Sequence, residues 1–155
     1  MGNLTTDLST SEFACPCKYP DCKAHKKVAH MPLVLAIQAA ADFFRKKYHA
    51  TDISVDITCG NRCKKHDVDV QMKDAGKTRA EAEAMDSQHV SCIAADHRMY
   101  VHTGTSKMLV PTEELYEYYD TTYPNSCGVG YYTDKNGGRI HIDTRATRAR
   151  WGKPK

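Results

Sequence analysis

The chain has 155 residues, about the length of one ordinary domain. Its composition, 41% hydrophobic and 26% charged with six prolines and nine glycines, is globular and excludes disorder and fibrous repeats. A formal net charge of +3 is too small to indicate a dedicated nucleic-acid-binding protein, so no nucleic-acid partner is expected.

Neither a membrane anchor nor a signal peptide is predicted. The longest apolar run, near residues 32–41, is interrupted by Gln38 and closed by Asp42, well short of the roughly 20 residues that span a bilayer. Residues 1–11 lack the basic head and apolar stretch of a secretory signal. Reduced thiols are therefore the expected state of the cysteines.

Residues 1–30 are polar and turn-rich, and we expect them to form a cysteine-rich arm over the core. Five metal-ligating side chains gather there: Cys15, Cys17, Cys22, His25 and His30. Such a group suits a structural zinc ion, but the paired Cys-x-x-Cys pattern is missing. Free thiols and one or two disulfides remain alternatives, for these cysteines as for Cys59 and Cys63. Because the chain has seven cysteines, at least one lies outside any internal disulfide.

The first regular elements are a helix and a strand. Pro32 suits the first turn of a helix over residues 32–48. Apolar residues then recur on one face of it: Leu33, Ile37, Ala40, Phe44 and Tyr48. Residues 53–57 alternate as a half-buried strand does, and Cys59-Gly60-Asn61 ends that strand in a turn.

The later elements complete an α+β pattern. Val68, Val70 and Met72 predict a second short strand, and residues 78–85 an exposed helical turn or two. Residues 92–101 are expected to form a strand that carries Asp96. These predictions place several short strands between helices, which favours a small antiparallel sheet with flanking helices.

A helix and a hairpin follow. Thr112 is a plausible helix cap before an apolar stripe of Leu115, Tyr118 and Tyr119. Residues 128–133 and 139–143 flank a turn that contains Asn136-Gly137 and predict a hairpin. Residues 144–155 form a basic tail, expected either to be solvated or to attract an anionic polymer such as the cell wall or nucleic acid. We expect residues 1–155 to form one domain.

Two segments carry candidate metal ligands. SQHVSCIAAD holds His89 and Asp96, and RIHIDTR holds His141 and Asp143. Strand alternation places His141 and Asp143 on one face, with Ile142 on the other. Two imidazoles and one carboxylate form a known catalytic zinc set that leaves a fourth position for water.

These segments also carry a family resemblance. SQHVSCIAAD resembles the Ser-x-His-x-x-Gly-x-Ala-x-Asp motif of the zinc D-alanyl-D-alanine peptidases, a group that includes the vancomycin-resistance D,D-peptidases, phage peptidoglycan endopeptidases and the zinc fold of Hedgehog signalling domains. EFACPC resembles the Glu-Phe-x-Cys opening of one branch, and ITCGNRCKKHD its Ser-Gly-Tyr-Arg-x-x-x-His-Asn loop. GVGYY, HIDTR and a terminal Trp resemble its C-terminal hairpin. The four segments occur in matching order over about residues 12–151.

The resemblance implies a Hedgehog/D,D-peptidase-like fold and assigns roles to residues. The zinc ligands would be His89, Asp96 and His141. Arg62 would bind a substrate carboxylate, although a solvated loop charge is the alternative.

The remaining polar residues of these segments have weaker assignments. His66 either faces the site or lies at the surface, and Ser87 either hydrogen-bonds within the ligand loop or is an ordinary turn serine. Tyr131 and Tyr132 are expected to be packing residues.

The sequence departs from the pattern at three places. Cys92 replaces the motif glycine, Cys59 and Asn61 replace the serine and tyrosine before the arginine, and Gly138 stands where several relatives have an acidic general base. Asp143 is then the candidate base. It could instead orient a ligating imidazole, pair with Arg145, or be purely structural.

The resemblance thus predicts a zinc-dependent metallopeptidase that hydrolyses a peptide bond in the stem peptide of bacterial peptidoglycan. Its expected origin is a phage lytic or virion-associated enzyme, found in the virion or in the host cytoplasm before release to the cell wall. Virion or tail proteins are expected partners, and a free enzyme is expected to be a monomer. The alternative is a catalytically inactive, zinc-holding cell-wall-binding or tail-assembly module.

Overall fold

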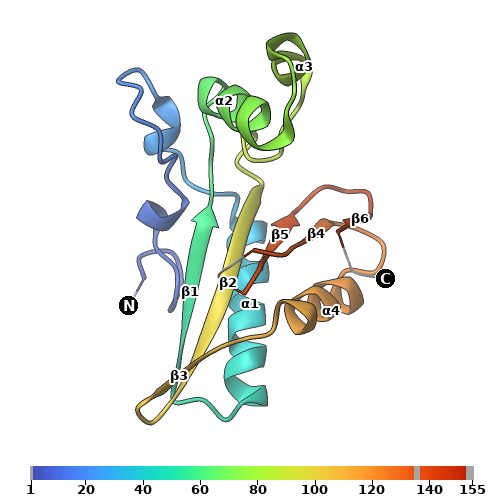
Figure 1. The fold of residues 1–155 in the computed structure, drawn as a ribbon. Helices are drawn as coiled ribbons and strands as arrows, with labels where there is room; N and C mark the ends of the chain where they lie inside the picture. Colours follow the sequence, from blue (N-terminus) through green and yellow to red (C-terminus); the bar gives the residue numbers. More distant parts are fainter. Residues whose placement is uncertain (1, 135–136, 153–155) are drawn as a thin grey trace.

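Helix α1 (Met31–Lys47) confirms the helix predicted at residues 32–48, with each end one residue earlier. Pro32 lies in its first turn, where a missing N–H costs no hydrogen bond. Leu33, Ile37 and Phe44 are fully buried, as the predicted apolar face requires, and belong to one cluster with residues of the sheet. In Figure 1, α1 runs along the back of the sheet.

The structure is a computed structural model that describes residues 2–134 and 137–152. Within these residues, six strands form one sheet in the order β1-β2-β5-β4-β6, and β3 pairs with β2. Their bounds are β1 Asp52–Cys59, β2 Ala94–Thr103, β3 Ser106–Leu109, β4 Gly128–Tyr132, β5 Arg139–Asp143 and β6 Ala149–Trp151. Together with the flanking helices, this sheet confirms the α+β class.

The sheet is mixed rather than purely antiparallel, because β6 pairs with β4 in parallel. The predicted basic tail supplies this strand, so part of residues 144–155 belongs to the fold. A three-residue strand carries too short an alternation to be recognised from sequence. Strand β3, which follows a turn at Gly104, was likewise not predicted.

Helix α4 (Thr112–Thr122) lies where the apolar stripe predicted it. The residue before the helix is Pro111, and the Thr112 hydroxyl donates to the carbonyl oxygen of Gly137 at 2.8 Å, so Thr112 is not the cap. The strands of the predicted hairpin are confirmed as β4 and β5. Asn136 of its predicted turn lies outside the described residues.

The predicted strand through Val68, Val70 and Met72 is wrong, because these residues lie in helix α2 (Lys64–Ala75). Val68 is 5% exposed whereas Met72 is 40% exposed, so their alternation does not define one buried face. The Sγ of Cys63 accepts a hydrogen bond from the backbone N–H of His66 and caps the helix.

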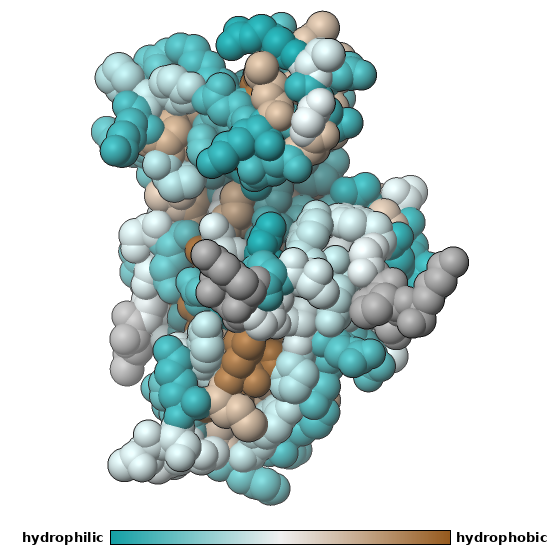
Figure 2. Space-filling model, viewed as in Figure 1, coloured by the Kyte–Doolittle hydropathy of each residue, from teal (hydrophilic) through white to brown (hydrophobic). Residues whose placement is uncertain are grey.

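Helix α3 (Arg79–Ala84) confirms the helical turns predicted at residues 78–85. The hydroxyl of Thr78 and the carboxylate of Glu81 form a reciprocal capping box at its start. In Figure 1, α2 and α3 lie together at the end of the sheet where β1 finishes, and Figure 2 shows mainly hydrophilic residues over them. Within the described residues, no helix has both the length and the apolar character that crossing a bilayer requires.

The N-terminal arm is part of the core. Two short 3-10 helices, Thr10–Phe13 and Lys23–His25, interrupt it, and Leu8 and Phe13 are fully buried. The backbone N–H of Asn61 donates to the carbonyl oxygen of Phe13 at 2.8 Å. The arm is therefore fixed to the turn that follows β1.

Candidate metal centre

The pairing of the strands brings five residues to one level of the sheet. Cys59 of β1 pairs with Asp96 of β2, and Asp96 pairs with His141 of β5. His141 in turn pairs with Gly130 of β4, which pairs with Trp151 of β6. Since neighbouring strands lie about 4.8 Å apart, two of the three expected zinc ligands are adjacent by register alone.

Alternation along β5 places the side chains of His141 and Asp143 on one face of the sheet. Ile140 and Ile142 are fully buried in the core cluster. His141 and Asp143 therefore project from the opposite face of the strand, as the sequence predicted.

His89 lies in the turn before β2, and its protonation pattern is set by a backbone carbonyl. Its Nδ1 is 2.8 Å from the carbonyl oxygen of Gly60. A carbonyl oxygen can only accept, so Nδ1 carries the proton and donates. In the neutral ring Nε2 then has a free lone pair, and it lies 3.5 Å from Asp96 Oδ1.

His141 is oriented in the same way by a carboxylate. Its Nε2 lies 3.0 Å from Asp143 Oδ2 and donates to it. In the neutral ring Nδ1 then carries a lone pair, and it lies only 2.9 Å from Asp96 Oδ1. Two acceptor atoms at this distance repel each other unless a proton or a metal cation lies between them.

Two of the three donor separations in this set fit a zinc ion. Donors about 2.1 Å from a tetrahedral ion are separated from each other by about 3.4 Å, and the distances to Asp96 Oδ1 are 2.9 Å from His141 and 3.5 Å from His89. In zinc sites the second nitrogen of a ligating histidine donates to a carboxylate or a backbone carbonyl. Asp143 and the carbonyl of Gly60 supply these two partners.

The charges of the site are complementary. Burial alone would lower the pKa of His89, but the hydrogen bonds to Asp96 and Cys59 raise it to about 10, so without a metal ion the ring is protonated, and a bound zinc ion would displace the proton from Nε2. Burial alone would raise the pKa of Asp96, but the hydrogen bonds to His141 and His89 hold it well below its usual range. Asp96 is thus an anion with 5% exposure, which a cation at this point would neutralise.

Cys59 offers an alternative third ligand. Its Sγ and donor atoms of His89 and Asp96 lie within 4.8 Å of one another. However, Cys59 lies 3.8 Å from Nδ1 of His89, the nitrogen that donates to Gly60, and its Sγ accepts from Nε of Arg62 at 3.0 Å. Nε2 of His89 and Nδ1 of His141 lie 3.5 and 2.9 Å from Asp96 Oδ1, so His141 and Cys59 are the two candidates for the third ligand beside His89 and Asp96.

Asp143 lies behind His141 and has no exposed surface. Its two oxygens accept from Nε and Nη2 of Arg145, at 2.8 and 2.6 Å, and from the backbone N–H of Gly128 at 3.1 Å. Burial raises its pKa, but the hydrogen bonds from His141 and Arg145 lower it well below its ordinary value. These contacts favour the orienting role over the general-base role.

Arg62 follows the turn after β1 and is held in place from two sides. Besides Cys59, its guanidinium donates through Nη1 to Asp67 Oδ1 at 3.1 Å, and the Asp67 side chain is fully buried. These contacts use two of five N–H donors, so a planar edge is left for a further acceptor.

A cleft of about 480 Å³ contains the donor set and Arg62, in the size range of ligand sites. Its lining also includes Asp74 of α2, Asp86 after α3, and Arg139 of β5. Nε of Arg139 lies 3.8 Å from Asp96 Oδ2. The cleft therefore gathers several charged groups, of which Arg139 lies beside Asp96.

The other predicted site residues have different positions. Ser87 lines the cleft, and its carbonyl oxygen accepts from the N–H of Val90 in a turn. His66 is in the first turn of α2, where burial and the charge of Arg62 lower its pKa, and it is not among the described residues that line the cleft. Tyr131 packs against the core, whereas Tyr132 lines the cleft.

The backbone conformation of Cys92 is one that favours glycine, the residue at this position of the motif that SQHVSCIAAD resembles. Its φ is 62°, in the left-handed region that favours glycine. Its carbonyl oxygen accepts from the N–H of His30 at 3.0 Å, and the residue is 9% exposed. The position thus requires a left-handed backbone conformation, and the fold accommodates the buried thiol of Cys92 there.

Sequence reasoning assigned no role to Gly130 or Trp151. A Cβ on Gly130 would lie 2.4 Å from the indole of Trp151, whose ring centroid is 5.1 Å from that of His141. The glycine therefore allows the indole to pack beside a metal ligand. The Gly-x-Gly spacing in GVGYY was the sequence feature that could have indicated this close packing.

Replacing Gly130 should test this packing. We expect Gly130→Ala to lower stability by about 1–3 kcal/mol, because the new methyl forces the indole to move. Thermal unfolding measures the effect, and in a Trp151→Ala background the same substitution should cost much less. An unchanged melting temperature for Gly130→Ala alone would contradict the proposed contact.

Replacing Asp143 should separate its two roles. As an orienting carboxylate, Asp143→Asn lowers zinc affinity by about 10- to 100-fold, and turnover returns at saturating zinc. As a general base, it would retain zinc and lose about 100- to 10,000-fold in turnover. Zinc titration with turnover measurements distinguishes them, and we expect the first result. Asp7→Asn, which breaks the distant Asp7–Arg45 pair, is the matched control.

Comparisons of this chain with protein-family models, curated proteins and solved structures found no match.

Proposed function

We propose that this chain is a zinc-dependent peptidase of the D-alanyl-D-alanine peptidase type, acting on a peptide bond of bacterial peptidoglycan. The observation that supports it most is the orientation of His89 and His141, whose lone pairs are both near Asp96 Oδ1. The substrate class rests on the resemblance of four ordered segments, and so does a phage lytic or virion-associated origin.

In this proposal His89, Asp96 and His141 hold the zinc ion. When bound, zinc would polarise the scissile carbonyl and lower the pKa of a water to about 7. The free guanidinium edge of Arg62 binds a carboxylate of the stem peptide and so positions the bond to be cut. Arg139 adds a positive charge that favours developing negative charge on the carbonyl oxygen.

The proton must be taken by a group that faces the cleft. Asp143 is occupied by His141 and Arg145, and Gly138 has no side chain. Asp74 and Asp86 are the exposed carboxylates of the cleft lining, on the side formed by α2 and the segment after α3. We propose that one of them acts as the general base. Of the two single substitutions Asp74→Asn and Asp86→Asn, we expect one to remove most of the turnover with zinc retained and the other to leave turnover unchanged.

The test is hydrolysis of isolated peptidoglycan by the purified protein. We expect new amino and carboxyl termini in the stem peptides by mass spectrometry, no products after chelation, and recovery when zinc is added. The identity of the new termini gives the bond that is cut. An absence of new termini with the site fully loaded with zinc would overturn the proposed activity.

A binding module is the second candidate, because no acidic residue precedes His141 at position 138 and Asp143 faces Arg145. Such a module would bind peptidoglycan in a zinc-dependent way and release no products. Cosedimentation with cell walls, run beside the hydrolysis assay, separates binding from cleavage.

A further inference from the structure

Four cysteine sulfurs meet where the N-terminal arm crosses the start of α2. Cys15, Cys17 and Cys22 come from the arm and Cys63 caps the helix, and their Sγ atoms all lie within 4.8 Å of one another. Cys15 is buried, and the others are half-buried. The fourth member of the group predicted in the arm is thus a cysteine from far along the chain rather than a nearby histidine.

The distances fit metal coordination better than disulfides. Cys17 Sγ and Cys63 Sγ are 3.7 Å apart. A disulfide has an S–S distance of about 2.05 Å, whereas four sulfurs about 2.3 Å from a tetrahedral zinc ion are separated by about 3.8 Å. All four cysteines are free thiols in the structure.

The two nearby histidines have other hydrogen-bond partners. Nε2 of His25 lies 2.7 Å from the carbonyl oxygen of Cys17 and 3.5 Å from Cys17 Sγ; it donates to the carbonyl, so this nitrogen lies beside the cluster and is not a ligand. Nδ1 of His30 is 3.1 Å from the hydroxyl of Thr144. The four sulfurs therefore form a complete set without a histidine.

The surroundings suit the charge of four thiolates on a divalent ion, which is −2. The N–H of Cys63 points to Cys15 Sγ at 3.4 Å, and the N–H of His66 points to Cys63 Sγ at 3.4 Å. Four lysines line a shallow pocket together with Cys22 and Cys63, namely Lys23, Lys27, Lys64 and Lys65, and Lys65 pairs there with Asp21 at 2.7 Å. Backbone donors and lysines of this kind stabilise a zinc–thiolate centre.

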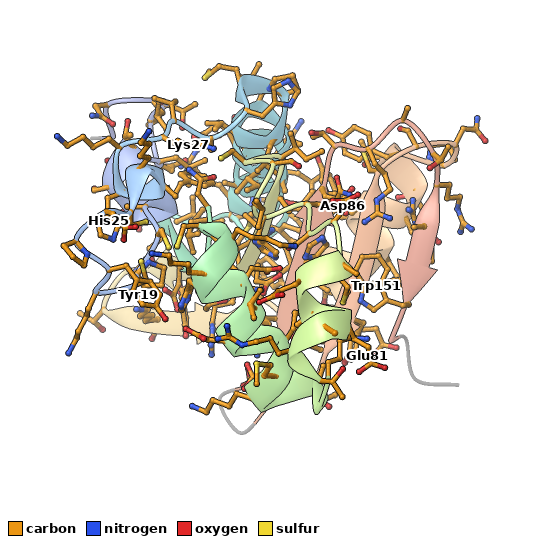
Figure 3. All side chains as sticks on the ribbon, turned by 90° about the horizontal axis from the view of Figure 1, so that it is seen from above. Tyr19, His25, Lys27, Glu81, Asp86 and Trp151 are labelled. Atoms are coloured by element: carbon orange, nitrogen blue, oxygen red, sulfur yellow. The ribbon has the colours of Figure 1, made fainter. Side chains whose placement is uncertain are left out.

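We propose that Cys15, Cys17, Cys22 and Cys63 hold a structural zinc ion, separate from the ion at His89, Asp96 and His141. Cys63 directly follows Arg62, so this ion ties the turn after β1 to the arm. In Figure 3, Tyr19 and His25 of the arm lie on one side of α2 and α3, and Trp151 of the cleft lies on the other. A role in positioning Arg62 rests on the proposed function, but the presence of the ion does not.

The test is the metal content of the full chain by native mass spectrometry, with each variant purified in zinc. We expect two zinc ions per chain in the wild type and one in Cys63→Ser. Because Cys63 also caps α2, Cys22→Ala, away from that helix, is the second variant, with the same expected count of one, and Cys22→His should restore two. Cys127→Ala, which changes a cysteine outside the cluster, should keep both ions.

A spectroscopic measurement distinguishes this site from the first. Cobalt in place of zinc should give sulfur-to-cobalt charge-transfer absorption that His141→Ala keeps and Cys22→Ala loses. If no metal ion binds at His89, Asp96 and His141, this absorption should still be present. Two zinc ions in Cys22→Ala, iron in place of zinc, or a mass lowered by disulfide formation would each overturn the proposal.

Discussion

We expect His141→Ala to lose the ion at the His89, Asp96 and His141 site and, with it, peptidoglycan hydrolysis. His89 and Asp96 do not complete a zinc site while Cys59 stays bound to Arg62, and the Asp96 carboxylate is left buried beside one imidazole. Because a metal ion contributes several kcal/mol to such a reaction, the rate should fall by at least about 1,000-fold. Zinc content and turnover, measured on the same preparation, check this.

The control is a histidine on the same sheet but outside the cleft. His102 of β2 interacts with the hydroxyl of Ser54 at 2.9 Å and is not one of the described residues that line the cleft. His102→Ala should keep zinc and turnover. Full turnover in His141→Ala at normal zinc content would refute the ligand assignment.

The second large effect is expected for Arg62→Lys. Lysine keeps the charge but loses the planar, two-pronged contact with a carboxylate, and a hydrogen bond to a charged group contributes about 1.5–3 kcal/mol. We expect kcat/KM to fall by about 10- to 150-fold, while the zinc content of the site at His89, Asp96 and His141 stays unchanged. Steady-state kinetics on a stem peptide measure the change.

This variant also loses its contacts with Asp67 and Cys59, so its stability has to be measured beside its kinetics. Arg79→Lys on exposed α3 is the matched control and should behave as the wild type. A stably folded Arg62→Lys protein with wild-type kcat/KM would exclude Arg62 as the carboxylate-binding residue.

The shared face of His141 and Asp143 was predictable because strand alternation fixes the face of each side chain. Ile140 and Ile142 had to point into the core, so His141 and Asp143 had to point away from it. Sequence could not show which nitrogen of His141 faces Asp96. That depends on the contact with Arg145 and Gly128 that holds Asp143 in place.

The errors came from contacts between distant segments. The alternation of Val68, Val70 and Met72 resembled a strand, but the helix is set by its capping residue Cys63 and by the burial of Val68. Cys63 also joins the arm cysteines only because the turn after β1 packs on Phe13. No local pattern contains this information.

The most direct measurement is a crystal structure of the zinc-loaded protein with anomalous diffraction data collected at the zinc absorption edge. We predict an anomalous peak with Nε2 of His89, an oxygen of Asp96 and Nδ1 of His141 all about 2.0–2.2 Å away. No peak at this position in zinc-loaded crystals, or a peak coordinated by Cys59 in place of His141, would contradict the metal centre described above.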